Sequence, residues 1–285
     1  MRPDRRAAYR APVNPRTPGR PLDVEALFPE VVPYRRRTVR LHPRAGSPRR
    51  RDSSVGGPLL WPAEEPWPTC PEHPGSPMVA VVQLRLADLP EEVVPFPDGC
   101  DLLQVLWCPR DHDGCWVEPL VVWRRAPAEG ARVRTAPPPP AGAVRRHLPR
   151  PCTVHPEAVT EYPSWDLPQE LWDALEERFD RLEEERGWAY QYHLSTAPGI
   201  KLGGYPGWSQ DPDVPRCPAC RRPMEHLLTV ESTEGDALSS TAWTPADQDP
   251  RTEGPGLTLG DLGGVYLFEC RRCPGRPFAQ RFDCA

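Results

Sequence analysis

The spacing of hydrophobic residues predicts one long helix in this chain. The helix is expected over Pro168–Arg186, where apolar residues recur with helical spacing on one face. Asp166 is expected to cap its start and Gly187 to end it. The apolar stripe consists of Leu171, Leu175, Phe179 and Leu182. Because the opposite face carries Glu and Arg, we expect the helix to lie across a sheet with one side in water.

The other periodic segments predict short strands. They are brief apolar runs or alternations of apolar and polar residues, which are typical of strands. The predicted strands are Thr38–His42, Met78–Leu84, Leu102–Trp107, Val117–Trp123, Trp188–Leu194, His226–Val230 and Gly264–Glu269. A short helix is expected at Asp23–Pro29, and long connections at 43–55, 126–151 and 231–263. The pattern therefore predicts an α+β fold that is mostly β.

A stretch of about thirty residues occurs twice. The first copy begins at Gly56-Gly57 and the second at Gly203-Gly204, and a shift of 147 aligns Gly, Gly, Trp, Pro, Cys and Pro without a gap. Each copy is followed later by an apolar run that ends in further Cys or His residues. We therefore expect two small antiparallel sheets related by an approximate twofold, each with a zinc-ribbon-like knuckle.

Composition adds domain limits to this picture. The 42 prolines among 285 residues favour short elements and long ordered connections. Residues 1–45 form a basic Arg- and Pro-rich arm, expected to be partly disordered. The first repeat is expected over 46–150 with a Pro-rich linker, and the helix with the second repeat over 151–285. The arm is either an interaction segment or a solvated tail.

The compartment of the protein can be predicted from targeting signals and from cysteine content. The first thirty residues show no apolar core of a signal peptide, and no run of 18 apolar residues could span a membrane. The sequence therefore predicts a cytoplasmic protein without membrane contact. Ten cysteines in a reducing compartment indicate metal ligands or buried thiols in preference to disulfides.

Four cysteines have the spacing of a metal site. The pairs Cys217-x2-Cys220 and Cys270-x2-Cys273 are separated by a long insertion, which loop-closure entropy tolerates. Two such pairs on hairpin turns supply a tetrahedral thiolate set for zinc. The alternatives are free buried cysteines or a redox-active pair.

A second, mixed site is predicted in the first repeat. Cys70-x2-His73 aligns with the first cysteine pair, and Cys108-x3-His112 would complete two thiolates and two imidazoles. Cys115 is an alternative to His112, and a copy that has lost its metal is the other interpretation. Because all ligands in both sets come from the protein, these would be closed structural zinc sites, one or two per chain. The remaining cysteines, Cys100, Cys152 and Cys284, are interpreted as structural thiols.

Two families share these motifs. The segment Lys201–Gln210, with the following Cys-x2-Cys and Pro223-Met224, resembles the bacterial YwqG-like family of unknown function. The same elements are similar to the repeats of programmed cell death protein 2, a eukaryotic zinc-containing protein. The resemblance covers roughly residues 55–125 and 188–285. It implies no catalytic residue, and the eukaryotic relative implies a chaperone-like role toward a ribosomal protein, which is an analogy of fold.

Three functions compete at this point. The leading one is a non-enzymatic protein-binding module, an escort or immunity protein for a basic partner. It would use Trp61, Trp67 and Trp208 on its surface and an acidic helix face; the alternatives are that each Trp packs the core beside its knuckle and that the helix face is ordinary solvated surface. The second is a nucleic-acid-binding zinc ribbon, suggested by the arginines of the arm. The third is an enzyme with a cleft near His193. The residues proposed for that cleft are His193, Gln191, Asp211 and Glu225.

Overall fold

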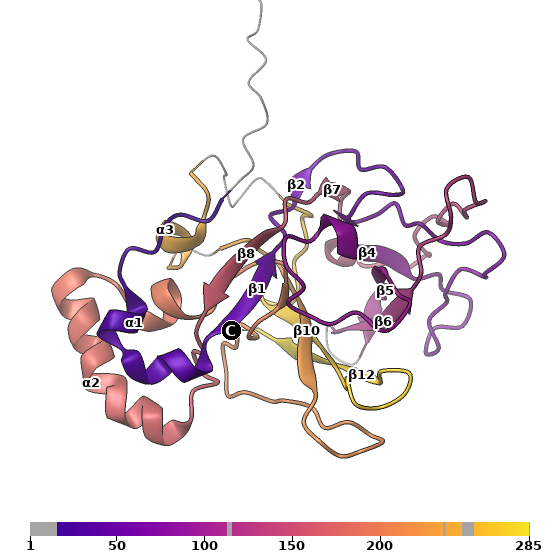
Figure 1. The fold of residues 1–285 in the computed structure, drawn as a ribbon. Coiled ribbons are helices and arrows are strands. Elements are labelled where there is room, and N and C mark those ends of the chain that lie inside the picture. Colours follow the sequence, from indigo (N-terminus) through magenta and orange to yellow (C-terminus); the bar gives the residue numbers. More distant parts are fainter. Residues whose placement is uncertain (1–15, 113–115, 236–237, 247–253, 285) are drawn as a thin grey trace, which may run out of the picture.

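The computed structural model describes residues 16–112, 116–235, 238–246 and 254–284. These residues form two six-stranded antiparallel sheets and one long helix (Figure 1). The prediction of an α+β, mostly β fold is therefore confirmed. None of the helices in the described ranges combines the length and the apolar character that crossing a bilayer requires.

The first sheet holds the strands of the first repeat. Its strand order is β2-β7-β3-β4-β5-β6. The bounds are β2 Arg44–Ala45, β3 Ser54–Val55, β4 Val79–Arg85, β5 Leu102–His112, β6 Trp116–Arg124 and β7 Cys152–Thr153. Strand β5 continues beyond the predicted Trp107, so Cys108 and His112 lie on extended backbone and not on a turn.

The second sheet has the same plan. Its order is β8-β1-β9-β10-β11-β12, read from the equivalent edge. The bounds are β1 Arg36–Arg40, β8 Glu157–Glu161, β9 Lys201–Gly203, β10 Glu225–Glu231, β11 Gly264–Glu269 and β12 Phe278–Asp283. The strands from β3 to β6 therefore match those from β9 to β12 in order and direction. The sequence pattern did not predict β12.

The two repeats exchange a strand. Strand β1 precedes the first repeat in the chain but pairs with β9 and β8 of the second sheet. Strand β7 precedes the second repeat but pairs with β3 and β2 of the first sheet. The polypeptide thus crosses between the sheets once before each repeat. The second sheet contains β1, which precedes the first repeat, and the first sheet contains β7, which precedes the second repeat.

Local details of the duplication also agree. Strand β4 has a bulge between Ala80 and Val82, and β10 has one between His226 and Leu228. Both Gly-Gly pairs adopt positive φ angles, near +74° at Gly56 and +72° at Gly204. A Cβ at Gly204 would lie 1.9 Å from the Glu161 carboxylate, which explains why glycine is required there.

One apolar core lies between the two sheets. Its buried residues come from the first sheet, including Val81 and Leu103, and from the second, including Leu202 and Leu267. Val39 of the exchanged strand β1 is completely buried in the same cluster. Together with the strand exchange, this shared core couples the stability of the two repeats.

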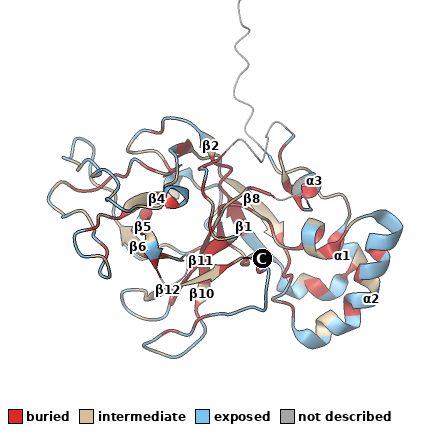
Figure 2. Cartoon of the chain, turned by 180° about the vertical axis from the view of Figure 1, so that it is seen from behind, coloured by how far each residue is buried: buried red, intermediate tan, exposed pale blue. Residues whose placement is uncertain are grey.

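The long helix packs away from this core. Helix α2 spans Gln169–Arg186, ends at Gly187 in the left-handed conformation, and buries Leu175, Phe179 and Leu182. These side chains contact the N-terminal helical segment, so the prediction that α2 lies across a sheet was wrong. The partners are helix α1, Val24–Leu27, the 3₁₀ helix Pro29–Tyr34 and the π-helix Tyr190–Ser195. The outer face of α2 is exposed (Figure 2).

Several local predictions need correction. Pro168 occupies the N-cap of α2, so Asp166 is not its cap. The segment predicted as a strand at Trp188–Leu194 contains the π-helix, which buries Tyr190 and Leu194 one turn apart. The connection 231–263 contains helix α3, Ser240–Trp243. In the arm, residues from 16 on are described, and the Thr17 amide donates to the Glu157 carboxylate at 2.7 Å.

Candidate metal centres

The four predicted cysteines of the second repeat come together. Cys217 and Cys220 lie on the turn before β10, whereas Cys270 and Cys273 follow β11. Their sulfur atoms all lie within 4.8 Å of one another. The Cys217–Cys273 and Cys220–Cys270 sulfur pairs are 3.8 and 3.7 Å apart. Neighbouring strands β10 and β11 thus bring together two pairs that are far apart in the chain.

These separations fit a tetrahedral metal site. Zinc–sulfur bonds of about 2.3 Å at tetrahedral angles place the sulfur atoms about 3.8 Å apart. A disulfide would instead bring two of them to about 2.0 Å. The observed pairs match the tetrahedral value, and the described cysteines are all free thiols. The cluster could therefore hold one metal ion.

Electrostatics in this cluster favour a bound cation. Backbone N–H groups of Cys220 and Ala219 help to lower the pKa of the Cys217 thiol to about 7. Hydrogen bonds with the neighbouring Cys220 and Cys270 thiols raise the pKa of Cys273 to about 12. Four adjacent thiols cannot all ionise without a positive charge among them. A divalent ion would supply that charge, because thiolates are the form that binds metal.

The mixed ligand set of the first repeat also comes together. Ligand atoms of Cys70, His73, Cys108 and His112 lie within 4.8 Å of one another. The Cys70 sulfur is 3.7 Å from His73 Nδ1 and 3.8 Å from His112 Nε2, and the Cys108 sulfur is 3.6 Å from His73 Nδ1. Bonds of about 2.3 Å to sulfur and 2.0–2.1 Å to nitrogen predict separations of about 3.6 Å.

A neighbouring carboxylate orients one of these imidazoles. His112 Nδ1 lies 2.7 Å from Glu72 Oε2, so its Nε2 is left free to face the cluster. Such a carboxylate fixes the tautomer and ring orientation of a metal-binding histidine. Desolvation and nearby positive charge lower the pKa of His73, which favours the neutral form that binds metal. The spacing of Cys and His predicted the ligands but not the role of Glu72, although Glu72 lies beside His73 in the same turn.

The tryptophans that follow the two Gly-Gly segments pack into the fold. Trp208 is only 6% exposed and packs with Cys217 and Phe268, and its indole donates to Asp166 at 3.3 Å. Trp61 is 3% exposed and lies against Trp67, whose indole donates to the Met78 carbonyl at 2.7 Å. Of the two interpretations of these side chains, core packing agrees with the structure and an exposed recognition surface does not. Trp208 packs beside the four-cysteine cluster, whereas Trp61 and Trp67 pack with Met78 and Leu106.

The other cysteines do not join either cluster among the described residues. Cys152 is buried on β7, and burial raises the pKa of its thiol to about 11. Cys100 and Cys284 are half-buried free thiols. Cys115, the alternative to His112, lies outside the described residues. His112 itself occupies the fourth position of the mixed cluster.

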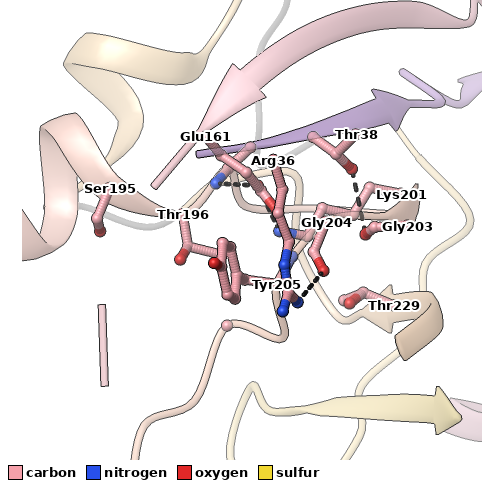
Figure 3. Close-up of polar contacts among 12 residues, drawn as sticks. Arg36, Thr38, Glu161, Ser195, Thr196, Lys201, Gly203, Gly204, Tyr205 and Thr229 are labelled. Atoms are coloured by element: carbon pink, nitrogen blue, oxygen red, sulfur yellow. Dashed lines mark hydrogen bonds and ion pairs between the residues drawn. The ribbon is translucent and has the colours of Figure 1, made fainter. Parts of the chain in front are cut away.

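A buried ion pair lies beside the second Gly-Gly (Figure 3). Lys201, the single lysine of the chain, contacts Glu161 at 2.8 Å, and both side chains are completely buried. Glu161 also accepts hydrogen bonds from the backbone amides of Ala197, at 2.9 Å, and Tyr205. This pair, which no sequence motif predicted, joins β8 to β9 and to the loop that follows.

The residues of the enzyme hypothesis do not converge. A cavity of about 690 Å³ lies at the second Gly-Gly and is lined by Glu225, but not by His193, Gln191 or Asp211. His193 lies in the π-helix, where its Nδ1 accepts from the Ala189 amide at 2.9 Å. The predicted catalytic cleft near His193 is therefore not supported, since its ring is engaged in local packing.

Fold and clusters together define a duplicated β-sheet protein with two candidate metal centres. A family profile described as "Domain of unknown function (DUF1963)" matches residues 53–268, well over half of the chain. The chain belongs to this family. The match runs from just before β3 to Phe268 in β11 and leaves β1, β2 and β12 outside it. Comparison with curated proteins gave no match.

Proposed function

We propose that the protein is a non-enzymatic, zinc-stabilised module that binds a basic protein partner. The observation that carries this proposal is the closed character of both metal clusters. Each offers four protein ligands at tetrahedral separations, so an ion held there has no open position for water or substrate. Closed sites of this kind stabilise structure, whereas catalytic zinc keeps a position free.

Zinc is the ion that these ligands favour. A tetrahedral set of four sulfurs, or of two sulfurs and two nitrogens, is typical of structural zinc. We infer that both clusters hold zinc and that each zinc fixes one end of its sheet. We propose that the protein is cytoplasmic. Cysteines stay reduced in that compartment, and the described cysteines form no disulfides with one another.

The exposed face of α2 is the surface we assign to the partner. Seven carboxylates line this face, and all are exposed. They are Glu170, Asp173, Glu176, Glu177, Asp180, Glu183 and Glu184. Among the described residues none of them makes an ion pair, since the one recorded contact is a hydrogen bond from Gln169 to Asp173. Unpaired charge of one sign accelerates encounter with a basic partner.

The relation to known families supports the same direction by analogy. We infer that membership of this family of unknown function extends to the YwqG-like proteins and, more distantly, to the repeats of programmed cell death protein 2. An escort role toward a basic client is then a reasonable first hypothesis, although a shared fold does not carry function by itself. An immunity role toward a basic toxin uses the same surface.

Charge reversal tests the proposal. Tagged protein is incubated with nuclease-treated extract of its own host at low salt, and captured proteins are identified. We expect a basic protein to be captured by the wild type and lost when Glu176, Glu177, Asp180 and Glu184 are changed to lysine. The matched control changes four other exposed carboxylates to lysine and should capture normally. The control residues are Asp98, Glu129, Asp211 and Asp261.

Two results would reject this assignment. Equal capture by the wild type and the α2 variant would remove the acidic face from the binding surface. A partner captured from untreated extract but not from nuclease-treated extract would show that nucleic acid carries the interaction. Zinc content and melting temperature are measured for each variant, so that lost capture is not confused with unfolding.

A further inference from the structure

Arginines surround the four-cysteine cluster. The two hairpin loops that carry the cysteines lie next to each other, one before β10 and one after β11 (Figure 1). Six arginines lie within three residues of a cysteine in these loops. They are Arg216, Arg221, Arg222, Arg271, Arg272 and Arg276. The question is which of them serve the fold.

Two of the six are part of the fold. Arg271 donates to Glu269 at 2.9 Å and to the His226 carbonyl at 3.1 Å. Arg276 contacts the same carboxylate at 3.1 Å and is also half-buried. Glu269 is completely buried. These two guanidinium groups therefore compensate a buried negative charge between the strands.

The other four are exposed and have no carboxylate partner among the described residues. We call Arg216, Arg221, Arg222 and Arg272 the arginine surface. The single side-chain contact recorded for it is a 3.3 Å hydrogen bond from Arg216 to the Arg221 carbonyl. Exposed guanidinium groups contribute little to fold stability, so the fold does not account for this concentration of positive charge.

Arg221 stands at a position that favours glycine. Its φ angle is +62°, in the left-handed region that residues with a Cβ seldom adopt. The first repeat has Gly75 at the corresponding point of its turn, with φ of +77°. Equivalent hydrogen bonds fix this alignment, from Cys70 to the Ser76 carbonyl and from Cys217 to the Arg222 carbonyl. Backbone strain of this kind is concentrated at functional sites, and Arg221 is therefore the residue of this turn to test first.

The first repeat also shows that the turn can form without arginines at the positions of Arg216 and Arg222. The residue equivalent to Arg216 is Thr69, and the residue equivalent to Arg222 is Ser76, as matching bridges and hydrogen bonds show. That turn nevertheless gathers its own four ligand atoms. The positive charge at Arg216, Arg221 and Arg222 is therefore a property of the second repeat, whereas Arg272 has a counterpart in Arg110, two residues after Cys108.

We propose that the arginine surface binds the phosphate backbone of nucleic acid. Guanidinium groups bind phosphate oxygens in pairs of parallel hydrogen bonds, and they do so best from a rigid support. Zinc in the four-cysteine cluster would hold both loops in place. The acidic face of α2 is a separate surface, so this inference does not depend on the protein partner proposed above. No base-specific contact is implied, because phosphate contacts carry no sequence information.

Salt dependence measures the number of phosphate contacts. Zinc-loaded full-length protein is titrated against a fluorescein-labelled single-stranded DNA of mixed sequence, and anisotropy is read at several NaCl concentrations. Four contacts predict a slope of log K against log salt near −2.8, roughly −0.7 for each contact on a single strand. Replacing all four arginines by glutamine should weaken binding by at least about tenfold at low salt and remove most of this slope.

Arg221→Gly separates binding from folding. It removes one guanidinium and relieves the left-handed strain, so we expect the slope to fall by about 0.7 while the protein melts no lower than the wild type. The matched control replaces four other exposed arginines by glutamine and should keep the wild-type slope. The control residues are Arg125, Arg132, Arg181 and Arg186.

Three outcomes would overturn the proposal. The first is a wild-type slope near zero, and the second is unchanged binding by the quadruple variant. The third is equal competition by polyglutamate and by unlabelled DNA at matched charge, which would assign the surface to an acidic protein. None of these outcomes affects capture of a basic protein by α2, so the two proposals fail separately.

Discussion

Replacing Lys201 by methionine tests the buried ion pair in the second repeat. Lys201 and Glu161 are completely buried and 2.8 Å apart. Methionine keeps the length of the side chain and removes its charge. Glu161 would then keep a buried negative charge whose remaining hydrogen bonds come from the backbone amides of Ala197 and Tyr205.

The size of the effect follows from this geometry. Removing one partner of a buried ion pair typically costs about 3–5 kcal/mol, because the other charge stays buried without compensation. For a chain of this size, roughly 2–4 °C of melting temperature correspond to each kcal/mol, so we expect a decrease of about 6–20 °C. The exchanged strands and the common core predict that both repeats unfold together.

Urea unfolding at a fixed free zinc concentration is the assay, because bound metal otherwise contributes to apparent stability. The control adds Glu161→Gln, which removes the remaining charge, to the Lys201→Met variant. We expect the double variant to be more stable than Lys201→Met alone. If Lys201→Met unfolds within about 1 kcal/mol of the wild type, the charge of Lys201 does not stabilise this fold in the way that buried pairs do.

Three further predictions concern the metal clusters and a buried acid. Glu72→Gln should weaken zinc binding at the mixed site about 10–100-fold, measured by chelator competition, because His112 loses its orienting carboxylate; unchanged affinity would contradict this. Cys217→Ser should lower the melting temperature strongly and Cys284→Ser hardly at all, and equal effects would argue against a stabilising metal. Burial raises the pKa of Glu234 to about 7, so its contribution to stability is greatest below about pH 4.5 and decreases as pH rises to about 7. The free energy of unfolding, measured in urea across this pH range, should therefore change less with pH for Glu234→Gln than for the wild type. Parallel pH profiles for the two proteins would refute the raised pKa of Glu234.

The ligand sets could be predicted because their signal is local. Each pair of ligands is separated by two or three residues, and the duplicated Gly-Gly segments align the two repeats, so the eight residues were named before their positions in space were known. Glu72 could have been found in the same turn. Its role depends on the ring orientation of His112, which lies 40 residues further along and leaves no mark in the spacing.

The strand exchange could not be predicted from hydrophobic pattern. Strand β7 has only two residues, Cys152–Thr153, and β2 has two, Arg44–Ala45. Segments this short have no readable periodicity, and partner choice is a property of the whole sheet. The π-helix was missed for a related reason, because Tyr190, Tyr192 and Leu194 alternate along the chain as in a strand. The structure buries Tyr190 and Leu194, whereas Tyr192 is 37% exposed.

The most direct test of the account is the metal content of the purified chain together with the atoms that surround the metal. Elemental analysis should give two zinc ions per chain. The two clusters offer six sulfur and two nitrogen ligands in total, so X-ray absorption at the zinc edge should fit an average of three sulfurs and one nitrogen per zinc. A result of one zinc per chain, surrounded by four sulfurs, would show that the first repeat holds no metal. A zinc content near zero in protein never exposed to chelator would contradict the central claim.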